Sequence, residues 1–238
     1  MTGVFDEILI AAGMGAAKED MRRYAELLTE KNKVMNLTRI TDEAEMAKKH
    51  FVDSAHPEIC SVIKKGARVI DVGTGGGFPG VPLKLMRPDI DITFLDAVRK
   101  KLDFVKESLE SMNIEASYVN KRAEEASEYF NKFDVVVSRA VASLPVLLEL
   151  CFSFCKKGGK IIAYKGAFGE EELQNSSEAL KKLSLKFLEK RDIEVDGASH
   201  CILVFERKTL NAPGYPRAYA KIKKRPLAGT GEQLTRSR

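Results

Sequence analysis

The stretch that decides the fold runs from residue 69 to residue 80 and reads Val69-Ile70-Asp71-Val72-Gly73-Thr74-Gly75-Gly76-Gly77-Phe78-Pro79-Gly80. Its first residues predict a buried strand that ends near an acid, and its glycines predict a turn into a helix. Glycine permits positive φ and lets a ligand approach the backbone without a Cβ in the way. Because the helix that follows begins with free N–H groups, the unit predicts a ligand site beyond the carboxyl end of the strand.

On both sides of this loop, short apolar strands alternate with helices. The candidate strands are Arg68–Val72, Ile92–Asp96, Ala116–Val119, Phe133–Ser138, Lys160–Tyr164, a segment around Leu185–Ile193, and Cys201–Arg207. Such alternation predicts a parallel sheet with helices on both faces. Only residues 196–199 separate the last two strands, which is too short for a parallel crossover and sufficient for a hairpin. We therefore expect a Rossmann-like α/β fold whose mostly parallel, seven-stranded sheet ends in an antiparallel hairpin.

Helical patterns flank the expected sheet. Before residue 65 the apolar residues recur only at helical spacing, Asp42 and Glu45 have the form of a capping box, and Pro57 predicts a helix boundary. Within the sheet region, two helices are predicted by apolar stripes at Val98, Leu102, Val105, Leu109 and Met112, and at Leu144, Leu147, Leu148, Cys151 and Cys155. The predicted organisation is an N-terminal helical extension (1–64), a ligand-binding domain (65–208) and a basic C-terminal tail (209–238).

Composition limits the class of protein. Hydrophobic residues make up 44% and charged residues 31% of the 238, the balance of a globular domain. Residues 1–15 lack the features of a signal peptide, and no apolar run approaches the roughly 18 to 20 residues that span a bilayer. The four cysteines form no CxxC pair, and only three histidines accompany them, so we expect a reducing, cytoplasmic location and no metal.

The positive charge is concentrated at the C-terminus. From Arg207 onward there are nine basic residues and one acid, Glu232, whereas residues 1–206 contain 30 basic and 33 acidic residues. A basic tail predicts a polyanionic partner such as RNA, although a solvated, disordered tail is an equal alternative. The candidate RNA-binding residues are Lys165, Arg217, Lys221, Lys223, Lys224 and Arg225.

The identity of the ligand is less obvious than its place. Gly75, Gly77 and Gly80 satisfy the dinucleotide pattern, so an NAD- or FAD-dependent oxidoreductase stays possible. The first glycine after the strand is Gly73, however, which makes the pattern Gly-x-Gly-x-Gly preceded by Asp71. An acid there suits the ammonium group of a methionine moiety, and Asp96, at the end of the next strand, suits a ribose diol. Together with the terminal hairpin, these residues favour S-adenosylmethionine and a class I methyltransferase domain.

Four motifs, spread over nearly the whole chain, carry a family resemblance. They are residues 71–80, Asn36-Leu37-Thr38, His50-Phe51-Val52-Asp53-Ser54, and Ser138-Arg139-Ala140-Val141-Ala142. In these motifs the chain resembles the RsmG family, also called glucose-inhibited division protein B, which methylates N7 of a guanine in 16S rRNA. The resemblance implies cofactor contacts at Gly73, Phe78, Ala123, Glu124 and Arg139. With the residues derived above, the expected cofactor set is Asp71, Gly73, Gly75, Gly77, Phe78, Asp96, Ala123, Glu124 and Arg139.

The tail departs from this family. Relatives tend to have a compact Gly-x-Pro run of lysines before Pro-Leu, whereas this chain has Gly214-Tyr215-Pro216-Arg217-Ala218-Tyr219-Ala220-Lys221. The departure concerns the contacts of the tail with RNA and leaves the expected chemistry unchanged. The expected partner is 16S rRNA or the small ribosomal subunit, and the chain is expected to act as a monomer.

The residues around Arg139 predict catalysis without a general base. The Asn/Asp-Pro-Pro-aromatic loop that assists methylation of exocyclic amines is missing, and no cysteine is placed to attack a pyrimidine carbon. Guanine N7 needs neither, because its lone pair is exposed and no proton has to leave. We expect Arg139 to position the reactants, since alignment alone can contribute about 7 to 11 kcal/mol. His50 and Asp53 lie three residues apart on a predicted helix, where they either orient each other, close over the cofactor, or belong to an ordinary hydrogen-bonded helix surface. A non-catalytic RNA-binding protein with a vestigial cofactor fold is the remaining alternative.

Overall fold

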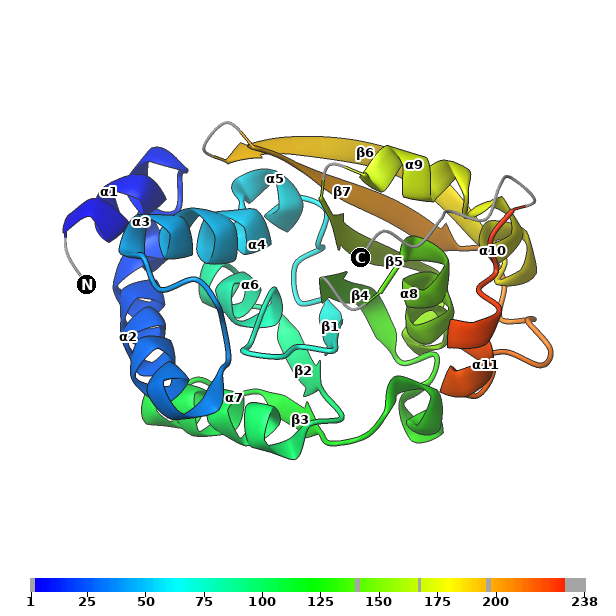
Figure 1. Ribbon diagram of the computed structural model, residues 1–238, viewed down its shortest axis with the longest axis horizontal. Coiled ribbons are helices and arrows are strands. Elements are labelled where there is room, and N and C mark those ends of the chain that lie inside the picture. Colours follow the sequence, from blue (N-terminus) through cyan, green and yellow to red (C-terminus); the bar gives the residue numbers. More distant parts are fainter. Residues whose placement is uncertain (1–2, 140–141, 167, 196–197, 230–238) are drawn as a thin grey trace.

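Seven strands form one sheet in the order β3-β2-β1-β4-β5-β7-β6 (Figure 1). The computed structural model describes residues 3–139, 142–166, 168–195 and 198–229. The strands are β1 Arg68–Val72, β2 Asp91–Leu95, β3 Ser117–Val119, β4 Phe133–Arg139, β5 Cys155–Lys165, β6 Leu185–Val195 and β7 Ala198–Arg207. Strands β1 to β5 pair in parallel, and β7 is antiparallel to both β5 and β6. The predicted mostly parallel sheet and its antiparallel hairpin are confirmed. The strand order reverses between β1 and β4, and the glycine loop follows β1 at this switch point.

Successive residues of the central strands face two separate cores. Val69 of β1 and Val135 of β4 belong to the core on one face, whereas Ile70 and Val136 belong to the core on the other. This alternation follows from the two-residue period of a strand, and it explains why these strands are apolar along their whole length. The first core is covered by α2 Lys18–Met35, α6 Gly80–Met86 and α7 Arg99–Ser111, and the second by α8 Leu144–Cys151, α10 Ser177–Lys182 and α11 Tyr219–Lys224.

One helix boundary was predicted wrongly. Cys155 does not continue the helical stripe of Cys151, because α8 ends at Cys151 and a 3₁₀ turn, Phe152–Phe154, leads directly into β5 at Cys155. The apolar spacing continues through this turn, so periodicity alone did not reveal the end of the helix. Both thiols are buried, as core cysteines are.

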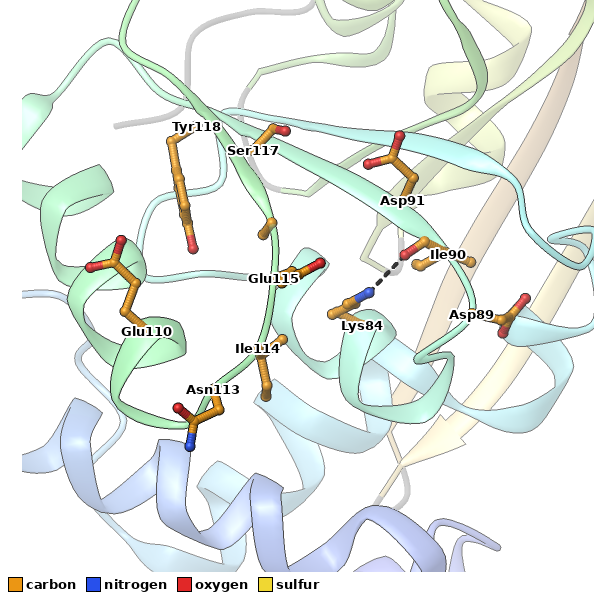
Figure 2. A pocket seen from close by; sticks show the side chains of 11 residues that line it. Lys84, Asp89, Ile90, Asp91, Glu110, Asn113, Ile114, Glu115, Ser117 and Tyr118 are labelled. Carbon is orange, nitrogen blue, oxygen red and sulfur yellow. Dashed lines mark hydrogen bonds between the residues drawn. The ribbon is translucent and has the colours of Figure 1, made fainter.

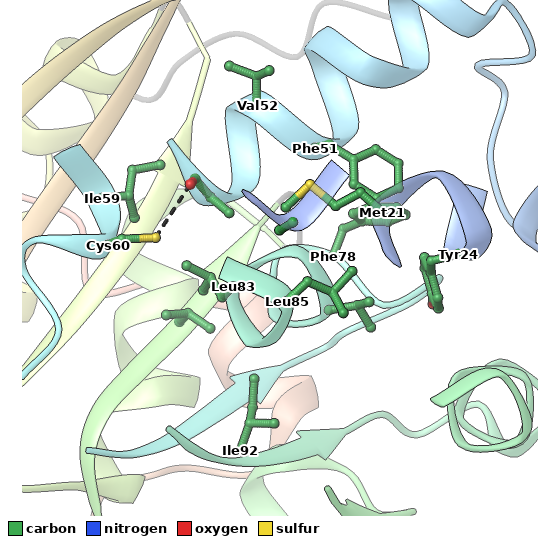
Figure 3. Close-up of a cluster of buried hydrophobic side chains, with 14 of the residues drawn as sticks. Met21, Tyr24, Phe51, Val52, Ile59, Cys60, Phe78, Leu83, Leu85 and Ile92 are labelled. Carbon is green, nitrogen blue, oxygen red and sulfur yellow. Dashed lines mark hydrogen bonds between the residues drawn. The ribbon is translucent and has the colours of Figure 1, made fainter. Parts of the chain in front are cut away.

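The N-terminal segment consists of helices, as predicted. They are α1 Gly3–Ala11, α2, α3 Glu43–Met46, a π-helix Ala47–Val52, α4 Asp53–Ala55 and α5 Pro57–Cys60. The carboxylate of Asp42 accepts a hydrogen bond from the backbone N–H of Glu45, and Pro57 occupies the first turn of α5, so both predicted helix signals are confirmed. Figure 3 shows how these helices share one core with the glycine loop, because Phe51 packs edge-on against Phe78 with ring centroids 5.5 Å apart.

The C-terminal segment folds back onto the sheet domain as far as the structure describes it. Helix α11 lies beside α8 (Figure 1), and the side chains of Ile222 and Leu227 are buried in the second core. Residues 230–238, which include Glu232, Arg236 and Arg238 of the predicted basic tail, lie outside the described residues. Within the described ranges, no helix combines the length and the apolar character that a membrane span requires. The short α9, Gly169–Gln174, completes the set of α-helices described.

Candidate active site

The glycine loop is held from below by a buried acid. Asp71 is fully buried, and its Oδ2 accepts hydrogen bonds from Thr74 Oγ1 at 2.7 Å and from the backbone N–H of Gly80 at 2.9 Å. Its Oδ1 has no hydrogen-bond partner among the described residues. Burial raises the pKa of this carboxyl group from 3.8 to about 7. Asp71, which the sequence predicts to contact the ligand, therefore holds the glycine loop in place through Oδ2, and its Oδ1 stays without a hydrogen-bond partner among the described residues.

Two glycines of this loop are required by its geometry. Gly77 has φ +91°, and a Cβ there would lie 2.2 Å from Tyr24 Oη. A Cβ on Gly80 would lie 2.5 Å from Phe94 Cε1 and 2.7 Å from Asp71 Oδ2. The loop thus packs directly against the N-terminal helix and strand β2, and only glycine allows this approach.

Asp96 ties the loop after β1 to the loop after β2. Its Oδ2 accepts a hydrogen bond from the N–H of Gly75 at 2.8 Å, and its Oδ1 accepts one from Val98 at 2.7 Å. The side chain is almost buried, with 8% exposed. It stands at the expected end of β2, and its contact with a ribose stays a prediction.

A small pocket of about 170 Å³ lies beyond the carboxyl ends of β1 and β2. The structure brings four predicted cofactor residues together in its wall, namely Gly73, Asp96, Ala123 and Glu124. The last two belong to a 3₁₀ turn, Ala123–Glu125, that follows β3. Sequence reasoning missed Arg122 and Tyr219, which also line this pocket. No spacing rule could bring Tyr219 here, because it comes from the C-terminal helix.

Arg139, at the end of β4, is enclosed by the π-helical segment. Its Nη1 donates hydrogen bonds to Asp53 Oδ2 at 2.9 Å, to Ser54 Oγ at 2.9 Å and to the carbonyl of Lys49 at 3.1 Å. The guanidinium carbon lies 5.1 Å from the ring centroid of Phe78. A π-helix is a common feature of functional sites, and here it directs a backbone carbonyl at the arginine. Ala140 and Val141, part of the motif that carried the resemblance, lie outside the described residues.

His50 completes this cluster. Its ring stacks on Phe78 at a centroid distance of 4.6 Å, and its Nε2 lies 2.6 Å from Thr38 Oγ1. Burial and the nearby charge of Arg139 lower the pKa of His50 from 6.5 to about 4, so the imidazole is neutral at physiological pH. The motifs around Thr38, His50 and Arg139 therefore converge on one site, although they are far apart in sequence.

A wider pocket of about 720 Å³ opens beside this cluster and is lined by Lys49, His50, Asp53, Arg139, Tyr164 and Lys165, among others. Lys165 Nζ lies 2.8 Å from Glu172, donates a hydrogen bond to the carbonyl of Ala142 at 2.7 Å, and has a side chain only 7% exposed. The RNA contact expected at Lys165 stays a prediction that these contacts do not test. They give Lys165 a structural role between β5 and α9.

The basic residues of the C-terminal segment divide into two groups. Arg217 forms an ion pair with Glu149 of α8, with Nη2 2.6 Å from Oε2, and Glu149 is fully buried. Arg217 therefore anchors the segment, and this contact does not support its expected role in RNA binding. In contrast, the other four expected RNA-binding residues of the segment are exposed, and these are Lys221, Lys223, Lys224 and Arg225.

A larger hollow of about 850 Å³ lies at the amino ends of β2 and β3 (Figure 2). Its wall carries Asp89, Asp91, Glu110 and Glu115, and its Lys84 donates a hydrogen bond to the carbonyl of Ile90 at 2.8 Å. It contains none of the predicted site residues, and its acidic wall is unsuited to a nucleic acid. Among the residues that the structure describes, no group of three or more His, Cys, Asp or Glu could hold a metal ion.

Comparison with known proteins gives close relatives in sequence. A family model described as rRNA small subunit methyltransferase G matches residues 17–195. The Ribosomal RNA small subunit methyltransferase G of Lactobacillus delbrueckii subsp. bulgaricus is 39% identical over 218 residues, which cover 88% of this chain and 91% of that protein. The protein of the same name from Acetivibrio thermocellus is 39% identical over 229 residues, which cover 91% of this chain and 93% of the relative.

Solved structures share the fold at low sequence identity. The PH0226 protein from Pyrococcus horikoshii OT3 superposes with a TM-score of 0.55 and 16% identity, over 75% of this chain and 99% of that one. The ribosomal protein L11 methylase from Lactobacillus delbrueckii subsp. bulgaricus superposes with a TM-score of 0.50 and 18% identity, over 63% and 74% of the two chains. The expected class I methyltransferase fold is confirmed.

Proposed function

The chain belongs to the rRNA small subunit methyltransferase G family, and from this premise we propose that it transfers the methyl group of S-adenosylmethionine to N7 of a guanine in 16S rRNA. The observation that carries the proposal is the juxtaposition of two sites at the carboxyl end of the sheet. Gly73, Asp96 and Ala123 line one pocket, and Arg139, on the adjacent strand β4, lines the other.

The residues present fit S-adenosylmethionine. The unpartnered, buried Oδ1 of Asp71 lies beneath the loop, where a cationic ligand would offset the cost of an ionised carboxylate. A Cβ built at Gly75 meets nothing within 4 Å, so the backbone there is open to a ligand. Asp71, Gly73, Gly75, Gly77 and Phe78 would hold the methionine portion. Asp96, Ala123 and Glu124 would hold the adenosine portion.

The chemistry supplied by bound S-adenosylmethionine is an electrophilic methyl carbon on a sulfonium centre. Guanine N7 attacks with its own lone pair, so the protein has no proton to remove and needs no general base. Arg139 is held by Asp53 and Ser54 and is well placed to orient a reactant. The neutral imidazole of His50 adds no charge that would repel the sulfonium. Catalysis then rests on the alignment of N7 with the methyl carbon.

The exposed cations of the C-terminal segment suit an RNA backbone. Lys221, Lys223 and Lys224 lie on one short helix, and Arg225 follows directly. Neutralising phosphates with such side chains releases counterions and supplies affinity without regard to sequence. Ribosomal RNA as substrate implies a cytoplasmic site of action, which agrees with the cysteine usage of the chain.

Binding and single-turnover experiments test the proposal together. Isothermal titration should detect saturable binding of S-adenosylhomocysteine and none of NADH, and labelled S-adenosylmethionine should methylate small-subunit RNA from cells lacking this activity. Binding of NADH alone would favour the oxidoreductase. Binding of RNA without any methyl transfer would favour a non-catalytic RNA-binding protein.

A further inference from the structure

The C-terminal helix contributes an aromatic ring to the pocket at the ends of β1 and β2. Tyr219, the first residue of α11, lines this pocket together with Ala97 and Ala123, which lie after β2 and β3. The tyrosine is half-buried and packs against the second core. Its ring is also held by Arg122, whose guanidinium carbon lies 5.5 Å from the ring centroid.

Tyr219 is placed by an anchor two residues earlier in the chain. The backbone N–H of Arg217 and its Nε both donate hydrogen bonds to Glu149 Oε1, at 3.0 and 2.8 Å, and Nη2 reaches Oε2. Glu149 lies on α8, the helix that also supplies Leu150 to the pocket wall. Because the described donors to the buried Glu149 carboxylate all belong to Arg217, these hydrogen bonds fix the backbone position of the segment around Arg217.

The residues of the pocket wall indicate which kind of ligand group the Tyr219 ring would contact. The side chains of Ala97 and Ala123 are small and leave room for a flat group, and the ring of Tyr219 belongs to the same pocket wall. A second hollow of about 580 Å³ shares Arg122, Glu124 and Tyr219 with the pocket, so the ring stands between the pocket and the surface. Aromatic rings in such positions stack on purine bases.

We infer that Tyr219 is a cofactor-binding residue that covers the adenine of S-adenosylmethionine, and that Arg217 and Glu149 are the residues that position it. This inference rests on the proposed function, since it assigns the pocket to the adenosine portion of that cofactor. It also gives the C-terminal segment a part in cofactor binding, which neither interpretation of the basic tail, RNA binding or a solvated tail, included.

The test uses the full chain and two probes, S-adenosylhomocysteine and 5′-methylthioadenosine, which lacks the amino-acid portion. Tyr219→Ala should weaken binding of both probes by about the same factor, about tenfold, which is within the range found for loss of a ring stacked on a base. Tyr219→Phe keeps the ring and should bind both within about twofold of wild type. Tyr129→Ala removes another half-buried tyrosine that packs against the same core and does not line this pocket, and it should also stay within about twofold.

Three outcomes overturn the inference. The first is that Tyr219→Ala binds both probes like wild type, and the second is that Tyr219→Phe binds as poorly as Tyr219→Ala. The third is that Tyr129→Ala loses as much affinity as Tyr219→Ala with the same drop in thermal midpoint, which would mean that both tyrosines only support the fold. If wild type itself binds neither probe, the proposed function fails instead, so the two failures are distinguishable.

Discussion

Arg139 Nη1 lies 2.9 Å from Asp53 Oδ2, and this ion pair joins the end of β4 to the N-terminal helices. The two side chains are only 14% and 7% exposed, so the pair is largely shielded from water. The glycine loop lies between the two elements, because Phe78 packs against both Arg139 and Phe51. The N-terminal helices are therefore part of the site as well as a cover for the sheet.

Arg139→Ala should lower the single-turnover rate of methyl transfer about a hundredfold, the effect of a small misplacement of reactants. Arg139→Lys should recover little, because lysine has neither the flat guanidinium that lies 5.1 Å from the Phe78 ring centroid nor the second nitrogen, Nη2, that lies 3.4 Å from His50 Nδ1. Rates are compared at saturating cofactor and RNA, with circular dichroism as the check on folding. A folded Arg139→Ala variant with the wild-type rate would limit Arg139 to a structural role.

Asp53→Ala should destabilise the protein by about 3 kcal/mol in urea unfolding, because it leaves the Arg139 guanidinium without its carboxylate in a shielded site. The matched control is Glu30→Ala, which breaks a pair with Lys33 whose side chains are 75% and 65% exposed. That change should cost less than about 1 kcal/mol. Equal losses in the two variants would show that the site pair is no stronger than a surface pair.

Asp71 should make stability fall as pH rises. Its pKa is about 7 in the folded protein and 3.8 in the unfolded chain, so between these values the folded state holds a proton that the unfolded state has lost. The stabilisation is complete below about pH 4 and is lost as pH rises through 7. Asp71→Asn removes this ionisation and keeps an oxygen that can accept from Thr74 and Gly80. Thermal midpoints from pH 5 to 8 should therefore decline less steeply in the variant; identical slopes would contradict the raised pKa.

Gly77→Ala should abolish both stability and cofactor binding, whereas Gly75→Ala should affect stability only mildly. The Cβ at Gly77 would collide with Tyr24 Oη at 2.2 Å and Val81 Cγ2 at 2.7 Å. At Gly75 the cost is that of a left-handed conformation, φ +56°, in open space, which is about 1 to 2 kcal/mol. Thermal unfolding of the two variants checks this order. Equal thermal midpoints would mean that helix α2, which carries Tyr24, shifts to accommodate the new Cβ without any loss of stability.

The fold could be predicted from sequence to a large extent, because each signal was local. Short apolar runs that alternate with helical stripes predicted the central strands, and the short segment 196–199 predicted the hairpin. Where the signal was ambiguous, the prediction failed: Cys155 continues a helical spacing and yet begins β5. The sequence motifs shared with the family also predicted which residues lie together at the carboxyl end of the sheet. They did not predict the contacts between these residues.

The roles of charged side chains were harder to predict. The sequence predicts RNA contacts at Lys165 and Arg217 from their charge, but it does not reveal their ion-pair partners Glu172 and Glu149, which only the fold brings near. Tyr219 reaches the pocket through the packing of α11 on α8, a contact between residues about 70 positions apart. Such long-range pairing leaves no trace in local patterning.

The most direct test of the central claim is the identity of the methylated nucleoside. Small-subunit RNA that lacks the modification is incubated with the protein and S-adenosylmethionine labelled in its methyl group, then digested and analysed by mass spectrometry. We expect the label in 7-methylguanosine, and we expect Arg139→Ala to remove most of it. Label in any other nucleoside, or none from a folded protein that binds S-adenosylhomocysteine, would contradict it.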